Sequence, residues 1–179
     1  MKPAITLIDW CVIAHDNSRF HGFHDAPDDG KPSRIPERQA LLHCEVTELF
    51  ESFRTDPNAP CGKEGLALSA AAEELADIVI RLFDFIGEFK IDPIGVFTHA
   101  TFASTRASCI LDDGYSLGEE ICIMHDTIAL LRRFPSDAAA RLFMQCVHFA
   151  KRYHYDLELA VSEKHRYNIN RPHMHGKRF

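Results

Sequence analysis

Apolar side chains recur every three or four residues through most of the chain, which is the spacing of helices that bury one face. The pattern predicts helices over residues 5–19, 37–54, 66–89, 117–134 and 136–168. The clearest apolar stripe belongs to the third segment and consists of Leu75, Ile78, Val79, Leu82, Phe85, Ile86 and Phe89. Convincing strand patterns are absent. The sequence therefore predicts an all-α protein, a helical bundle.

Proline and glycine mark the connections between these helices. Residues 57–62 contain two prolines and a glycine, which separate the second helix from the third, and Pro93 ends the third. Residues 94–115 have no clean period, so we expect a loop or short irregular structure there. Ser136 is a candidate N-cap for the last helix, and Pro172 stops that helix.

The composition is that of an ordinary globular domain. The chain has 179 residues, 46% of them hydrophobic and 26% charged, which predicts one domain over residues 1–179 and excludes a disordered chain. A net charge of −6 argues against nucleic acid as a partner. No apolar run approaches the roughly 18 residues of a membrane span, so we expect no membrane partner. Six scattered cysteines without a C-x-x-C pair are typical of free thiols in the cytoplasm.

Two carboxylate pairs lie on two neighbouring predicted helices. Glu45 and Glu48 form an E-x-x-E motif, and Glu74 and Asp77 form an E-x-x-D motif. Residues three apart lie on one helix face, so antiparallel packing would bring the four carboxylates together. Mg²⁺ or Mn²⁺ holding a phosphorylated substrate would then balance their charge. The alternative is solvated acids at the border of two amphipathic helices, where such spacings are common.

A cationic face ends the last predicted helix. Lys164, Asn168 and Arg171 lie at positions i, i+4 and i+7, which is one helix face. An ammonium, an amide and a guanidinium in a row suit a polyphosphate chain. The alternative is a solvated basic turn that complements the helix dipole.

The order of these motifs resembles a known family, the MazG-like branch of the all-α nucleoside triphosphate pyrophosphohydrolases. The same superfamily contains dimeric dUTPases, dCTPases and phosphoribosyl-ATP pyrophosphohydrolase. The most similar stretches are residues 41–49, 73–82 and 163–177, the last containing K-x-x-x-N-x-x-R and a terminal H-G-K. The resemblance covers about two-thirds of the chain and implies hydrolysis of a nucleoside triphosphate to the monophosphate and pyrophosphate.

The resemblance also implies roles for individual residues. Mg²⁺, with Mn²⁺ as a possible substitute, would be bound by Glu45, Glu48, Glu74 and Asp77. The phosphates would be held by Lys164, Asn168 and Arg171, and the base would be contacted by Asn17 and Phe23. Glu48 would orient or deprotonate the attacking water. For Phe23, core packing is the alternative role. Family sites are often completed between subunits, so a homo-oligomer, a dimer or a tetramer, is expected.

The chain departs from the family pattern after the E-x-x-D helix. About 60 further residues precede the helix with Lys164, and we expect residues 93–155 to be an insertion that contains a helical hairpin. The segments Phe85–Asp92 and Phe149–Asp156 resemble each other and flank it. The expected fold is thus a MazG-like helical bundle with an inserted helical hairpin.

Two other function classes stay open. One is a non-catalytic helical adaptor that keeps the fold and binds a nucleotide or a protein without turnover. The other is a transition-metal protein, because the chain has 11 histidines. His21, His24, His173 and His175 flank glycine-containing loops, and the last two form an H-x-H pair.

Overall fold

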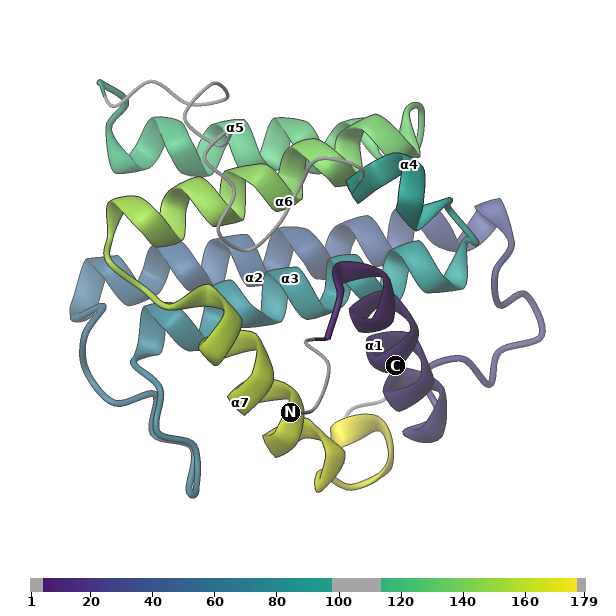
Figure 1. Cartoon of the computed structure of the whole chain (residues 1–179), viewed down its shortest axis with the longest axis horizontal. Coiled ribbons are helices and arrows are strands. Elements are labelled where there is room, and N and C mark those ends of the chain that lie inside the picture. The colour runs from purple at the N-terminus through teal and green to yellow at the C-terminus, as the bar shows by residue number, and fades with distance from the viewer. Residues whose placement is uncertain (1–4, 98–113, 177–179) are drawn as a thin grey trace.

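The fold is an all-α bundle, as the periodicity predicts (Figure 1). The computed structural model describes residues 5–97 and 114–176, and these parts of the chain contain no strand. Its elements are α1 (Leu7–Phe20), η1 (Pro32–Arg34), α2 (Ile35–Thr55), α3 (Ala70–Glu88), α4 (Pro93–Phe97), α5 (Leu117–Leu130), α6 (Pro135–Arg152), α7 (Leu157–Ile169) and η3 (His173–Gly176).

The centre of the bundle is α3, which packs against α1, α2, α6 and α7. Leu75, Ile78, Val79 and Leu82 of α3 are completely buried, so the predicted stripe forms the core. In Figure 1, α2 and α3 run antiparallel through the middle, with α5 and α6 on one side and α1 and α7 on the other. This arrangement leaves the α1 and α7 side of α3 available to build a site.

The connection between α2 and α3 is longer than the periodicity predicts. Leu66 and Leu68 are buried, but they lie in the loop, where the Cys61 N–H donates to the Leu68 carbonyl at 3.0 Å. The Ser69 side chain accepts a hydrogen bond from the Ala72 N–H and caps the helix, so α3 begins at Ala70 and the predicted start at residue 66 is wrong. Apolar loop residues therefore extended the apparent helical pattern.

The helix predicted over residues 136–168 is also wrong, because the chain breaks into α6 and α7. His154 takes a left-handed conformation, with φ of 61°, and the Tyr155 N–H donates to the Ala150 carbonyl at 2.8 Å. The Asp156 side chain then accepts from the Leu159 N–H at 3.0 Å and caps α7. The break turns α7 back onto α3.

The end of α3 has the same hydrogen-bond pattern as the end of α6. Lys90 has a φ of 51°, and the Ile91 N–H donates to the Ile86 carbonyl at 3.1 Å. A left-handed residue followed by this six-residue hydrogen-bonded loop is a Schellman cap. The similarity of Phe85–Asp92 and Phe149–Asp156 therefore corresponds to two equivalent helix ends.

The segment between these two ends contains α4 and the α5–α6 hairpin. The helix α4 lies within the stretch expected to be irregular, and residues 98–113 lie outside the described residues. At the start of α6, Phe134 takes the N-cap position and Pro135 the first helical turn, so the predicted cap at Ser136 is wrong. Since α5 packs on α2 and α6 packs on α3, the hairpin covers the central helices.

None of the helices in the described parts combines the length and apolarity needed to cross a membrane. The five described cysteines, Cys11, Cys44, Cys61, Cys122 and Cys146, are all free thiols, and Cys109 lies outside the described residues. The prediction of unpaired cysteines holds for those five.

Candidate functional site

A cavity of about 270 Å³ opens where α1, α2, α3 and α7 meet. Seven of the nine residues proposed from the sequence line it, namely Asn17, Phe23, Glu45, Glu48, Asp77, Asn168 and Arg171. The remaining lining residues are Ala14, Ser18, Arg38, Leu41, Lys63, Ile80, Arg81 and Asp84. Charged side chains from segments far apart in the sequence therefore share one cavity.

The antiparallel packing of α2 and α3 brings the predicted carboxylates together. Oxygen atoms of Glu45, Glu48 and Glu74 lie within 4.8 Å of one another. A second group, within the same limit, joins Glu74 to Asp77 and to the buried Glu73. Such groups of oxygen donors could hold a divalent cation. Glu73 was not singled out from the sequence, where it is one more acid beside the E-x-x-D motif.

Three cations contact these carboxylates. The Arg81 Nε donates to Glu45 at 2.5 Å, Lys63 of the α2–α3 loop pairs with Glu73, and Lys164 of α7 pairs with both Glu73 and Asp77. Sequence patterns do not single out Lys63 or Arg81, because neither residue belongs to a motif. Only the fold shows that they face the acids.

The environment shifts the pKa values of two paired groups in opposite directions. Burial raises the pKa of Asp77, and the negative charges of Glu45 and Glu74 raise it further. Burial lowers the pKa of Lys164, and the nearby Lys63 lowers it further. A cation that entered beside Asp77 would favour the charged form of this carboxylate, whereas it would repel the neighbouring ammonium of Lys164.

Lys164 and Asn168 are buried, whereas the side chains of a solvated basic turn would be exposed to solvent. Both are buried on α7, with Lys164 fully enclosed, and Lys164 does not line the cavity. Arg171 lies beyond the end of α7 and lines the cavity, and its N–H donates to the Asn168 carbonyl at 3.1 Å. The predicted face is therefore split between a buried lysine in the acidic cluster and an arginine at the cavity wall.

Asn17 and Phe23, the residues expected to contact the base, also line the cavity. Asn17 lies near the end of α1, and Phe23 follows Gly22, whose φ of 84° completes the helix cap. A side chain at Gly22 would collide with the His173 ring, since an added Cβ would lie 2.0 Å from its Nε2. The half-buried Phe23 is anchored through its carbonyl, which accepts a hydrogen bond from Arg38 at 3.1 Å.

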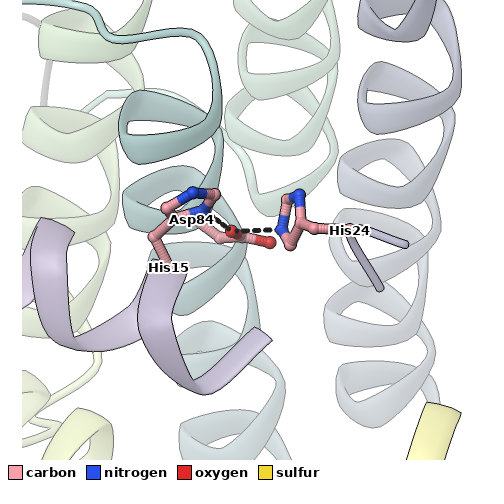
Figure 2. A group of neighbouring side chains, drawn as sticks. All are labelled: His15, His24 and Asp84. Carbon is pink, nitrogen blue, oxygen red and sulfur yellow. Dashed lines mark hydrogen bonds and ion pairs between the residues drawn. The ribbon is translucent and has the colours of Figure 1, made fainter. Parts of the chain in front are cut away.

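Asp84 lies two turns beyond Asp77 and is held by histidines (Figure 2). His15 Nδ1 and His24 Nε2 each lie 2.9 Å from Asp84 Oδ1. Burial alone would raise the pKa of Asp84, but the hydrogen bonds from His15 and His24 lower it to about 2. Asp84 is thus a half-buried carboxylate that is hydrogen-bonded to two imidazoles.

The H-x-H pair does not gather other ligands in the described residues. His173 is exposed and lies 3.7 Å from Asp25, while the side chain of His175 lies outside the described part of the structure. His24 belongs to two groups of possible metal ligands, one with His15 and Asp84 and one with Asp29 and Glu88. The first of these groups was missed because its members are 9 and 60 residues apart.

Comparisons of the chain with family models, with curated proteins and with solved structures found no match. The resemblance of the motifs to the pyrophosphohydrolase family therefore stays a prediction. The function has to be argued from the chemistry of the cavity.

Proposed function

We propose that the protein is a Mg²⁺-dependent pyrophosphohydrolase that converts a nucleoside or deoxynucleoside triphosphate to the monophosphate and pyrophosphate. The observation that carries the proposal is one cavity whose lining combines two kinds of side chain. Carboxylates and cations line it together with Phe23, Leu41 and Ile80. A nucleotide has the same division between a charged phosphate chain and a flat base.

The carboxylates that would hold Mg²⁺, or Mn²⁺ in its place, are Glu45, Glu48, Glu74 and Asp77. Their donor atoms are all oxygens, which both ions prefer. Lys63, Arg81 and Lys164 pair with three of the five carboxylates in the two acidic groups, namely Glu45, Glu73 and Asp77. A divalent cation would add positive charge to the same groups. When bound, it would polarise a phosphate oxygen and lower the pKa of a coordinated water.

The proposed phosphate-binding residues are Lys164, Asn168 and Arg171, and we add Lys63 because it also lines the cavity. Arg171 lines the cavity and forms no side-chain ion pair with any residue that the structure describes. Its guanidinium is therefore available to donate two parallel hydrogen bonds to a phosphate. Lys63 and Lys164 would neutralise negative charge that develops on the departing pyrophosphate.

Glu48 is the proposed proton acceptor. It is exposed in the cavity, and within the described parts of the chain it has no hydrogen bond or ion pair, unlike Glu45 and Asp77. A carboxylate without a fixed partner can accept a proton from water. The water oxygen bonds to the α-phosphorus while the bond from that phosphorus to the α–β bridging oxygen breaks. Pyrophosphate leaves with the bonding electrons, and the proton goes to Glu48.

We further propose that Asn17 and Phe23 contact the base and that the protein forms a dimer or tetramer. The Phe23 ring can stack on a base, and the Asn17 amide can donate and accept hydrogen bonds.

Exposed apolar side chains support the proposed oligomer. Ile5, just before α1, is 50% exposed, and Ile8 and Val12 of α1 are 39% and 57% exposed. Apolar side chains gathered on one surface support contact with another subunit. Light scattering would test this, and a monomer at all concentrations would contradict it.

A screen of pyrophosphate release tests the function. Canonical, deoxy and modified nucleoside triphosphates are each incubated with the protein in Mg²⁺, in Mn²⁺ and in EDTA. We expect equal amounts of monophosphate and pyrophosphate from at least one substrate, and none in EDTA. Release of orthophosphate would contradict attack at the α-phosphorus. If a folded protein releases no product from any of these nucleotides, the result would favour the non-catalytic adaptor.

A further inference from the structure

A group of possible metal ligands that contains two histidines lies beside the cavity, apart from the two acidic groups. His15 of α1, His24 of the following turn and Asp84 of α3 converge from three places in the chain (Figure 2). Each imidazole aims a ring nitrogen at Asp84 Oδ1, over 2.9 Å in both cases. Two imidazole nitrogens and one carboxylate oxygen are a typical donor set for zinc and related transition metals.

Outer hydrogen bonds fix the orientation of these groups. His24 is 1% exposed in its side chain, and its Nδ1 lies 2.6 Å from Asp29, so its Nε2 is the nitrogen that faces Asp84. Ser18 donates to Asp84 Oδ2 at 2.8 Å, which leaves Oδ1 toward the two rings. Metal-binding histidines and carboxylates are usually oriented by outer partners of this kind.

Close packing of α1 on α3 fixes the position of His15. Gly87 faces His15, and a Cβ added at this glycine would lie 2.5 Å from the Cβ of His15 and 3.2 Å from the Cys11 carbonyl. Any side chain at position 87 would push α1 away from α3. The absence of a side chain there therefore sets the approach of His15 to Asp84.

We propose that His15, His24 and Asp84 bind a divalent transition metal, with Zn²⁺ as the best match. Ligands about 2.0–2.1 Å from a tetrahedral zinc lie about 3.3 Å apart, so the 2.9 Å separations need only a small opening. The metal replaces the protons that the rings now share with Asp84, and these protons go to solvent. Asp84 and Ser18 line the cavity, so a metal on Asp84 would lie beside the space proposed for substrate.

The proposed zinc site is distinct from the proposed Mg²⁺ site. Asp84 follows Asp77 by seven residues on α3, which corresponds to about 10 Å along a helix. The two sites also differ in donor type, since nitrogen ligands favour zinc over magnesium. Failure of the zinc site would leave the proposed hydrolysis unaffected, and the reverse also holds.

Metal binding itself tests the proposal, without reference to activity. Chelator-treated protein is titrated with Zn²⁺ by calorimetry and with Co²⁺ by visible absorption, which reports tetrahedral nitrogen and oxygen ligation. We expect one high-affinity metal per chain, and His15→Ala should lower the affinity for this metal at least about tenfold. His43→Ala is the matched control, because His43 is also half-buried but pairs with His125 away from the cluster. Glu48→Gln should leave the cobalt spectrum unchanged.

A second variant protects the test against misfolding. Asp29→Asn keeps all three ligands, weakens the hydrogen bond to His24 and removes the 3.9 Å ion pair with Arg38, so the affinity for Zn²⁺ should fall by roughly 10–100-fold. Circular dichroism confirms that each variant is folded before titration. The proposal is overturned if the wild-type protein binds no stoichiometric zinc. Equal affinity in wild type and in folded His15→Ala and Asp29→Asn overturns it too, and the cluster is then a proton-linked contact between α1 and α3.

Discussion

Lys164 and Asp77 form a buried ion pair, with 2.6 Å between the ammonium nitrogen and the carboxylate oxygen. The pair joins α7 to α3, two helices that are separated in the chain by the α5–α6 hairpin. Under the proposed function, Asp77 is a metal ligand and Lys164 a phosphate ligand. Each residue is thus the other's partner until metal and substrate arrive. This relationship couples the stability of the fold to occupation of the site.

Glu48→Gln should separate catalysis from stability. We expect turnover to fall by at least about 100-fold, because the substitution removes a proton acceptor. The free energy of unfolding should change by no more than about 0.5 kcal/mol, since Glu48 is exposed and has no partner among the described residues. Steady-state kinetics and urea unfolding measure the two effects. Glu51→Gln, one turn further along α2, is the control and should keep full activity; near-normal turnover in Glu48→Gln would contradict the assignment.

Lys164→Ala should destabilise the protein in the absence of metal. Its removal leaves the buried Glu73 and the neighbouring Asp77 without this cation, and breaking a buried ion pair costs about 3–5 kcal/mol. Millimolar Mg²⁺ should recover part of the loss, because it supplies positive charge to the same carboxylates. Urea unfolding with Mg²⁺ and with EDTA measures both effects. An unfolding free energy equal to that of wild type would show that Lys164 does not balance these acids.

His125 should make the protein less stable as the pH falls. Burial lowers the pKa of His125 below its ordinary value, although Asp126 opposes the shift. The unfolded chain then binds the proton more readily than the folded protein, so stability is lost as the pH drops below about 6.5. Thermal unfolding from pH 8 to pH 5 should show a shallower loss in His125→Asn than in wild type. Parallel curves for the two proteins would exclude this contribution.

His154→Gly should stabilise the protein. His154 has a φ of 61°, and a left-handed conformation costs a residue with a Cβ about 1–2 kcal/mol. Glycine avoids that cost but loses about 0.5–1 kcal/mol of backbone entropy, so we expect a net gain of about 0.5 kcal/mol. Arg141→Gly, at an exposed position inside α6, should instead lose about 1 kcal/mol. Chemical denaturation compares them, and a loss of stability in His154→Gly would show that this ring makes an essential contact.

The sequence predicted those parts of the fold that depend on local periodicity. The stripe from Leu75 to Phe89 identified α3 as a buried helix, and the two E-x-x-[ED] motifs placed carboxylates on facing helices. The sequence pattern could not predict the break at His154, because apolar positions continue through it and histidine is not a residue that marks a left-handed turn. Leu66 and Leu68 misled the prediction in the same way, because they are buried by tertiary contacts from within a loop.

The candidate site was predictable only where its residues form a motif. Lys63 and Arg81 approach the carboxylates from a loop and from the flank of α3, and no spacing rule connects them to Glu73 or Glu45. The contact of His15 and His24 with Asp84 depends on how closely α1 packs against α3. That distance is set by Gly87, a small residue whose importance appears only in three dimensions.

The cavity is walled by α1, α2, α3 and α7, so any molecule bound in it would tie together four helices that otherwise meet mainly through α3. Binding energy would then be shared among all four, and local opening of any one of them would first require release of the ligand. Amide hydrogen exchange in α1 and α7, the two outer walls, should therefore slow together when the cavity is filled. The outer helices would act as reporters of occupancy even at amides that never touch the ligand.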